Sequence, residues 1–233
     1  MSVVASAAAA ASFAADVLER ACRDAIASRG RALVAVSGGT TPVAMLQAFA
    51  RRDLPWQSVF MAQVDERCVP RDDPRRNLAA LEQALVTDGP LARTNLLAVP
   101  VSPDESAAEI ARRYGRELRD LANGPLTFDI VQLGLGDDGH TASLVPGDPV
   151  LAVLDADVAS TQAYRGTERV TLTRPAIDRA RERLWLVTGS SKAAALAALV
   201  AGAGDSPAVS IRRDTTSVVA DLDAAISLPA SPA

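Results

Sequence analysis

The chain has 233 residues, enough to bury a substantial core, and because its composition stays even and no repeat occurs along it, we expect one domain over residues 1–233. Its 24 lysine and arginine residues against 28 aspartate and glutamate residues give a formal net charge of -4, without the basic excess of a nucleic-acid-binding protein. No apolar run approaches the ~18 residues that a membrane span needs.

The cysteines and the start of the chain indicate the compartment. Cys22 and Cys68 lie far apart and accompany a single histidine, so we expect neither a zinc site nor a disulfide framework. The alanine-rich start lacks the basic and leucine-rich regions of a signal peptide and is better read as an amphipathic helix. We therefore expect a cytoplasmic protein with no metal, no nucleic-acid partner and no membrane association. The oligomeric state is left open by the sequence, with a monomer as the simplest expectation.

Short apolar runs and helical spacings alternate along the chain. The runs predict buried strands over residues 32–36, 58–64, 95–99, 128–133, 169–173, 184–188 and 217–220. Helices are expected over residues 12–28, 43–52, 77–85, 103–122 and 192–200, with a short one from residue 174, while residues 150–165 lack a regular pattern. This alternation favours the α/β class, with a doubly wound, mostly parallel sheet and helices on both faces.

The loop over residues 134–144 is the strongest candidate for a functional site. It follows an apolar strand and combines three glycines with Asp137, Asp138 and His140, the only histidine in the chain. Glycines let the backbone turn sharply near a ligand, and a histidine can move protons at neutral pH. A lone histidine is more often structural. Its place at the carboxyl end of a strand, where α/β proteins bind ligands, favours catalysis.

Two further loops have the composition of anion sites. Ser37–Thr41 joins a buried strand to a helix that starts near Pro42, and Gly189–Lys192 does the same farther along the chain. Free backbone N–H groups and the positive helix end could hold a phosphate there. An ordinary β-to-α turn with a threonine cap, and a solvated lysine, are the plainer alternatives.

These loops, together with Asp65, Glu66 and Arg67 at the end of another strand, should meet at one edge of the sheet. The sequence thus predicts a small anionic ligand beside a histidine. It contains no nucleophile elbow, no GxGxxG after the first strand and no P-loop, so acyl-serine, dinucleotide and nucleoside-triphosphate chemistry have no support.

Five motifs resemble, in matching order, those of the 6-phosphogluconolactonase family. They are SGGTTP at residues 37–42, DER at 65–67 followed by Asn77, GLGDDGHTASL at 134–144, RVTLT at 169–173 and GSSKA at 189–193. The resemblance covers about residues 10–225. It implies the family's α/β fold and the hydrolysis of 6-phosphogluconolactone to 6-phosphogluconate in the oxidative pentose phosphate pathway, without a redox cofactor or a required metal.

The resemblance also implies roles for individual residues. His140 matches the family's proposed general base, and Asp138 could orient it. Arg67 could stabilise either the developing oxyanion or the hydroxyl side of the substrate. The substrate phosphate would meet Ser37, Gly38, Gly39, Thr40, Arg169 and Lys192. Further residues expected to line the site are Asp65, Asn77, Gly136, Asp137 and Gly139.

Two other functions compete with this reading. SGGT and DER also occur in the related glucosamine-6-phosphate deaminases, but their central loop usually continues toward Asn-Glu-Pro-Gly, whereas residues 141–147 here read TASLVPG. A non-catalytic sugar-phosphate sensor would carry a helix-turn-helix domain, which the single alanine-rich helix before residue 30 does not provide.

Overall fold

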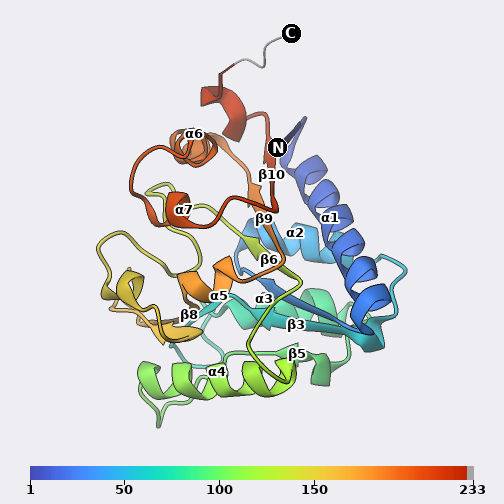
Figure 1. Cartoon of the computed structure of the whole chain (residues 1–233), viewed down its shortest axis with the longest axis vertical. Coiled ribbons are helices and arrows are strands. Elements are labelled where there is room, and N and C mark those ends of the chain that lie inside the picture. Colours follow the sequence, from blue (N-terminus) through green and yellow to red (C-terminus); the bar gives the residue numbers. More distant parts are fainter. Residues whose placement is uncertain (230–233) are drawn as a thin grey trace.

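The computed structural model describes residues 1–229, and its centre is a sheet of seven parallel strands (Figure 1). Across the sheet the strands are β1 (Ser2–Val4), β10 (Thr216–Asp221), β9 (Glu182–Val187), β6 (Ile130–Leu133), β2 (Ala32–Val36), β3 (Val59–Gln63) and β5 (Leu96–Leu97). From β2 the chain builds outward through β3 to β5, then returns to β6 on the other side of β2. The order therefore reverses between β2 and β6, and ligands bind at such reversals.

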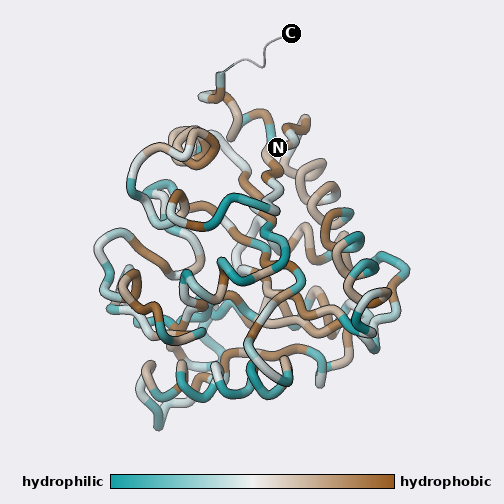
Figure 2. Tube along the Cα trace, in the orientation of Figure 1, coloured by the Kyte–Doolittle hydropathy of each residue, from teal (hydrophilic) through white to brown (hydrophobic). Residues whose placement is uncertain are grey.

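Helices cover both faces of this sheet because its strands are apolar on both faces. On β2, Leu33 and Ala35 pack into one hydrophobic cluster, and the intervening residues of the strand pack into the other. The second cluster lies under α1 (Ala7–Arg29), α2 (Thr40–Phe49) and α3 (Asn77–Glu82), and the first lies under α4 (Ala107–Ala122), α5 (Arg174–Asp178), α6 (Ala193–Ala201) and α7 (Pro207–Ser210). Figure 2 shows the hydrophilic residues along α4 and the hydrophobic ones along the strands. The predicted α/β architecture is confirmed.

A second, antiparallel sheet was not predicted. Its strands are, in order, β4 (Asp65–Arg67), β8 (Arg169–Leu172) and β7 (Val158–Ser160). The expectation that residues 65–67 form only a loop is therefore wrong, whereas residues 150–165, expected to be irregular or partly extended, contain the short strand β7. Three-residue strands are too short to show a period, and the charged β4 has no apolar run. This sheet matters because β4 and β8 carry predicted site residues.

Several element boundaries also differ from the prediction. β1 was missed, and α1 begins at Ala7, where the hydroxyl of Ser6 accepts a hydrogen bond from the N–H of Ala9. α4 begins only at Ala107, because Ser106 and Glu109 form a capping box. In residues 1–229, no helix combines the length and the hydrophobicity needed to cross a membrane.

Short helical turns complete the fold. A π turn continues α3 over Gln83–Thr87, and single 3-10 turns lie at Trp56–Ser58, Arg93–Asn95, Pro149–Ala152, Ser190–Lys192 and Ala224–Ser227. The turn at Ser190–Lys192 leads into α6, so the chain enters that helix directly from the carboxyl end of β9.

Candidate active site

A cavity of about 430 Å³ opens at the carboxyl ends of β2, β6 and β9, where the strand order reverses. The predicted residues in its wall are Ser37, Gly38, Gly39, Thr40, Asp65, Arg67, Asn77, Gly136, His140, Arg169 and Lys192. Asp137, Asp138 and Gly139 do not line it and lie in the loop that carries His140. The structure thus brings together residues that are up to 155 positions apart, from Ser37 to Lys192.

The loop after β6 is folded tightly around His140. The N–H of Gly136 donates to the carbonyl of His140 at 2.8 Å, which closes the loop on itself. A Cβ atom on Gly136 would lie 2.1 Å from Nδ1 of His140, so only glycine leaves room for the imidazole ring. Because residue 136 is glycine, the imidazole ring of His140 can pack directly against the backbone of its own loop.

His140 is paired with Asp138. Its Nδ1 lies 2.6 Å from Oδ1 of Asp138, and its backbone N–H donates to the same oxygen at 3.1 Å. Burial alone would raise the pKa of the Asp138 carboxyl, but hydrogen bonds from the N–H and ring of His140, and from Tyr164, lower it overall. A carboxylate at Nδ1 favours the tautomer with the proton on that nitrogen, so Nε2 carries the lone pair. This is the arrangement that a general base needs.

Asp65 and Arg169 lie on the antiparallel sheet, line the cavity, and both contact the hydroxyl of the buried Ser143. Ser143 Oγ donates to Asp65 Oδ2 at 2.6 Å, and Arg169 Nη1 lies 3.5 Å from the same hydroxyl. Burial raises the pKa of the Asp65 carboxyl, although the hydrogen bond from Ser143 opposes this. Burial also lowers the pKa of the Arg169 guanidinium, whose Nε has no hydrogen-bond partner within the described residues.

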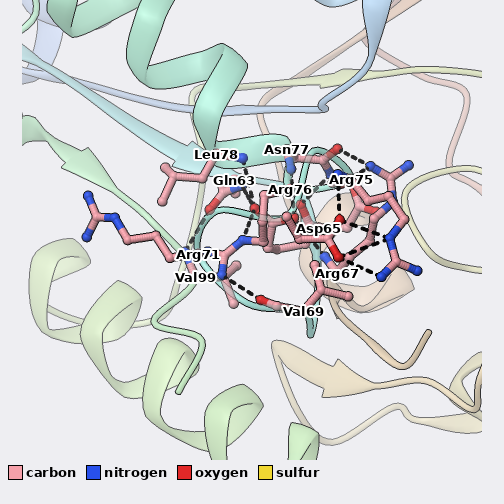
Figure 3. Close-up of polar contacts among 12 residues, drawn as sticks. Gln63, Asp65, Arg67, Val69, Arg71, Arg75, Arg76, Asn77, Leu78 and Val99 are labelled. Atoms are coloured by element: carbon pink, nitrogen blue, oxygen red, sulfur yellow. Dashed lines mark hydrogen bonds and ion pairs between the residues drawn. The ribbon is translucent and has the colours of Figure 1, made fainter. Parts of the chain in front are cut away.

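Arg67 and Asn77 form another part of the wall. Arg67 Nη1 donates to Asn77 Oδ1 at 2.9 Å, and Asn77 Nδ2 donates to the Asp65 carbonyl at 3.1 Å (Figure 3). A Cβ atom on Gly38 would lie 2.2 Å from Cγ of Asn77, so the loop after β2 can approach only because residue 38 is glycine.

The buried carboxylate of Glu66 holds this part of the wall in place. It accepts hydrogen bonds at 2.8 Å from the N–H groups of Arg67 and Asn77, and another from that of Leu78. Arg76 Nε lies 3.2 Å from the same carboxylate, which balances its charge inside the protein. The sequence placed Glu66 in the motif but gave no sign of this supporting role.

Several of the residues predicted to bind the substrate phosphate lie at the starts of two helices, α2 and α6. Gly39 and the following threonines open α2, and Lys192 precedes α6 across the cavity. Thr41 Oγ1 lies 3.1 Å from Thr188 Oγ1, so the loops after β2 and β9 touch directly. The Ser37 hydroxyl donates instead to the carbonyl of Gln132 at 3.1 Å, which ties its loop to β6.

Three of the positive side chains in this cavity lack a direct ion pair with the described part of the chain. Within residues 1–229, Arg67, Arg169 and Lys192 form no ion pair with a carboxylate, although all three line the wall. Elsewhere the arginines are commonly paired, as Arg76 is with Glu66. Lys192 at the start of α6, with Arg67 on β4 and Arg169 on β8, therefore forms a surface suited to an anion.

Comparison with known proteins identifies the family. Residues 5–220 match the family model described as glucosamine-6-phosphate isomerases/6-phosphogluconolactonase. The chain belongs to this family. A relative named 6-phosphogluconolactonase from Synechocystis sp. is 37% identical over 185 residues, covering 78% of this chain and 76% of that protein. Another of that name, from Mycobacterium tuberculosis, is 34% identical over 220 residues, covering 88% of each.

A solved structure shares the whole architecture. The 6-phosphogluconolactonase from Trypanosoma cruzi superimposes with a TM-score of 0.86 at 25% identity, covering 97% of this chain and 95% of that one. The family's sheet and its helices on both faces therefore extend over almost the entire chain, including the strands around the cavity.

Two residues of this family member were missed by the sequence analysis. Arg165 lines the cavity and lies 3.8 Å from Asp137, and Tyr164 bonds to Asp138. Both come from residues 150–165, where no periodicity was visible. The one local signal was Gly166, whose positive φ of 81° accompanies a tight turn.

Proposed function

We propose that the chain hydrolyses 6-phospho-D-glucono-1,5-lactone to 6-phospho-D-gluconate. The names of its relatives from Synechocystis sp. and M. tuberculosis support this activity. The observation that carries the proposal is the His140–Asp138 pair, at 2.6 Å, beside a cavity lined by cations without carboxylate partners. A base next to an anion site is what hydrolysis of a phosphorylated lactone requires.

In the proposed mechanism, Nε2 of His140 accepts a proton from water as the water oxygen attacks the lactone carbonyl carbon. The carbonyl electrons move onto oxygen, and Arg67 stabilises the oxyanion. When the carbonyl re-forms, the bond to the ring oxygen breaks, and this oxygen takes the proton from His140. Asp138 stabilises the imidazolium between the two steps. No atom changes its oxidation state, so the reaction needs no redox cofactor.

The phosphate of the substrate would bind in the same cavity, where the loops after β2 and β9 meet. The backbone N–H groups of Gly38, Gly39 and Thr40 stand at the start of α2, and Lys192 and Arg169 supply positive charge. Holding the phosphate fixes the lactone carbonyl relative to His140, which converts water attack into a positioned reaction.

The test is lactone hydrolysis followed against the spontaneous background, with phosphorylated and unphosphorylated gluconolactone side by side. We expect enzymatic turnover with a strong preference for the phosphorylated lactone. Glucosamine-6-phosphate is the control substrate, because the family description also names its isomerases. Conversion of glucosamine-6-phosphate without lactone turnover would replace the proposal with the isomerase function, and binding of 6-phosphogluconate without any turnover would indicate a sensor.

A further inference from the structure

A tight hairpin between β7 and β8 brings Tyr164 to the loop that carries Asp138 and His140. Tyr164 and Thr167 pair in antiparallel fashion, and the two residues between them, Arg165 and Gly166, both have positive φ angles, 51° and 81°. Such a two-residue turn is typical of the tightest hairpins and leaves its flanking residues little freedom. The N–H of Tyr164 donates to the Thr167 carbonyl at 2.9 Å. The backbone thus fixes where the tyrosine ring can lie.

From this position Tyr164 contacts both members of the proposed catalytic pair. Its hydroxyl donates to Oδ2 of Asp138 at 3.1 Å, whereas His140 uses only Oδ1. Its ring packs edge-on against the imidazole, with centroids 5.6 Å apart and planes at 64°. The Asp138 side chain is 37% exposed, so protein packing alone would not hold its carboxylate in one orientation.

Two arginine side chains also pack on the Tyr164 ring. The guanidinium groups of Arg165 and Arg169 each lie 5.1 Å from its centroid. Arg169 is itself buried beside Ser143, in the wall of the cavity. Tyr164 therefore links the anion-binding arginines to the carboxylate that orients the base.

We propose that Tyr164 is a positioning residue that fixes the orientation of Asp138 and, through it, the tautomer and direction of the His140 ring. The inference rests on the hydrolytic function proposed above. Without the tyrosine hydroxyl, Asp138 keeps one bonded oxygen and can rotate about its Cβ–Cγ bond, which loosens the hydrogen bond to Nδ1. The base then spends less time with its lone pair on Nε2.

Tyr164→Phe tests this directly, because it removes the hydroxyl and keeps the ring. We expect kcat to fall roughly tenfold, the rate equivalent of one hydrogen bond to a charged group, with KM and the affinity for 6-phosphogluconate unchanged. Tyr164→Ala should in addition raise KM, because the arginines lose the ring on which they pack. Gln162→Ala, an exposed position on the same hairpin, is the matched control and should retain wild-type kinetics.

A second readout does not depend on turnover. His140 is the only histidine, so ¹⁵N NMR of the imidazole gives one set of ring resonances. We expect a single Nδ1–H tautomer in the wild-type chain and a mixture in Tyr164→Phe. Wild-type kcat together with an unchanged tautomer in Tyr164→Phe would overturn the proposal. Absence of lactone turnover in the wild-type chain would instead count against the proposed function, and the NMR comparison would still decide the role of Tyr164.

Discussion

Nδ1 of His140 lies 2.6 Å from Oδ1 of Asp138, two residues earlier in the same loop. Because only one residue separates them in the sequence, a single turn of the backbone carries both the proposed base and the carboxylate that orients it. The N–H of His140 donates to the same oxygen, so the loop conformation and the ring orientation depend on one carboxylate. The predictions about catalysis follow from this pair.

Replacing His140 by alanine should remove the base and leave the rest of the cavity in place. Loss of one general base typically costs ~10²–10⁴-fold in rate, so we expect kcat to fall by that factor. Affinity for 6-phosphogluconate, measured by calorimetry, and the melting temperature should stay near the wild-type values, because the ring lies in the cavity wall and is partly exposed. A variant that kept most of its kcat would remove His140 from the mechanism.

The pH dependence of kcat/KM should have an acid limb that belongs to the imidazole. Hydrogen bonds from His140 and Tyr164 hold the pKa of the Asp138 carboxyl below its ordinary value, so this group is already ionised at neutral and mildly acidic pH. A base must be neutral to accept a proton, so activity should fall once the pH is low enough to protonate the ring. Asp138→Asn removes the charge that favours the imidazolium, so its acid limb should move to lower pH while kcat decreases.

The substrate phosphate titrates near ~6 and would also produce an acid limb. Unphosphorylated gluconolactone lacks that group and is the control, with spontaneous hydrolysis subtracted at each pH. An acid limb in the same place in Asp138→Asn as in the wild-type chain would mean that the titrating group is not coupled to Asp138.

The parts of the site that could be predicted from sequence are those carried by single stretches of chain. β2 was predicted at its observed limits, because five apolar residues followed by a glycine turn leave few other structures. The loop around His140 was recognisable because its glycines, aspartates and histidine are adjacent. The predicted convergence followed from parallel strands sharing one carboxyl edge.

The contacts that could not be predicted join distant stretches without a local pattern. Asp65 and Ser143 are 78 positions apart, and nothing in either stretch indicates their hydrogen bond. Tyr164 lies in a segment whose regular structure is limited to one 3-10 turn, a three-residue strand and a tight hairpin turn. Such pairings depend on how the antiparallel sheet packs at the end of the parallel one, and local periodicity carries no information about that packing.

Lys192 is the only lysine in the chain, and it should contribute to phosphate binding. It lines the cavity next to the start of α6. Lys192→Ala should weaken binding of 6-phosphogluconate by about 1.5–3 kcal/mol, the usual contribution of a hydrogen bond to a charged group, while hydrolysis of the unphosphorylated lactone changes little. Lys192→Arg keeps the charge and should retain most of the affinity. Calorimetry that found wild-type affinity in Lys192→Ala would make it an ordinary solvated lysine.

Glycine at position 136 should be required for activity and not for the fold. A Cβ atom there would lie 2.1 Å from Nδ1 of His140 and 2.6 Å from Oδ1 of Asp138, so Gly136→Ala must displace both side chains. Because the strain falls on two side chains of one loop, we expect a loss of kcat of about 10²-fold, the scale of a 1 Å misplacement, with a nearly unchanged far-ultraviolet circular dichroism spectrum. Gly134→Ala is the matched control, since a Cβ atom at Gly134 meets no atom within 4 Å and the residue has no positive φ. It should keep most of its turnover. Equal losses in the two variants would mean that the loop needs glycine for its backbone, and that the space around the His140 ring is not the reason.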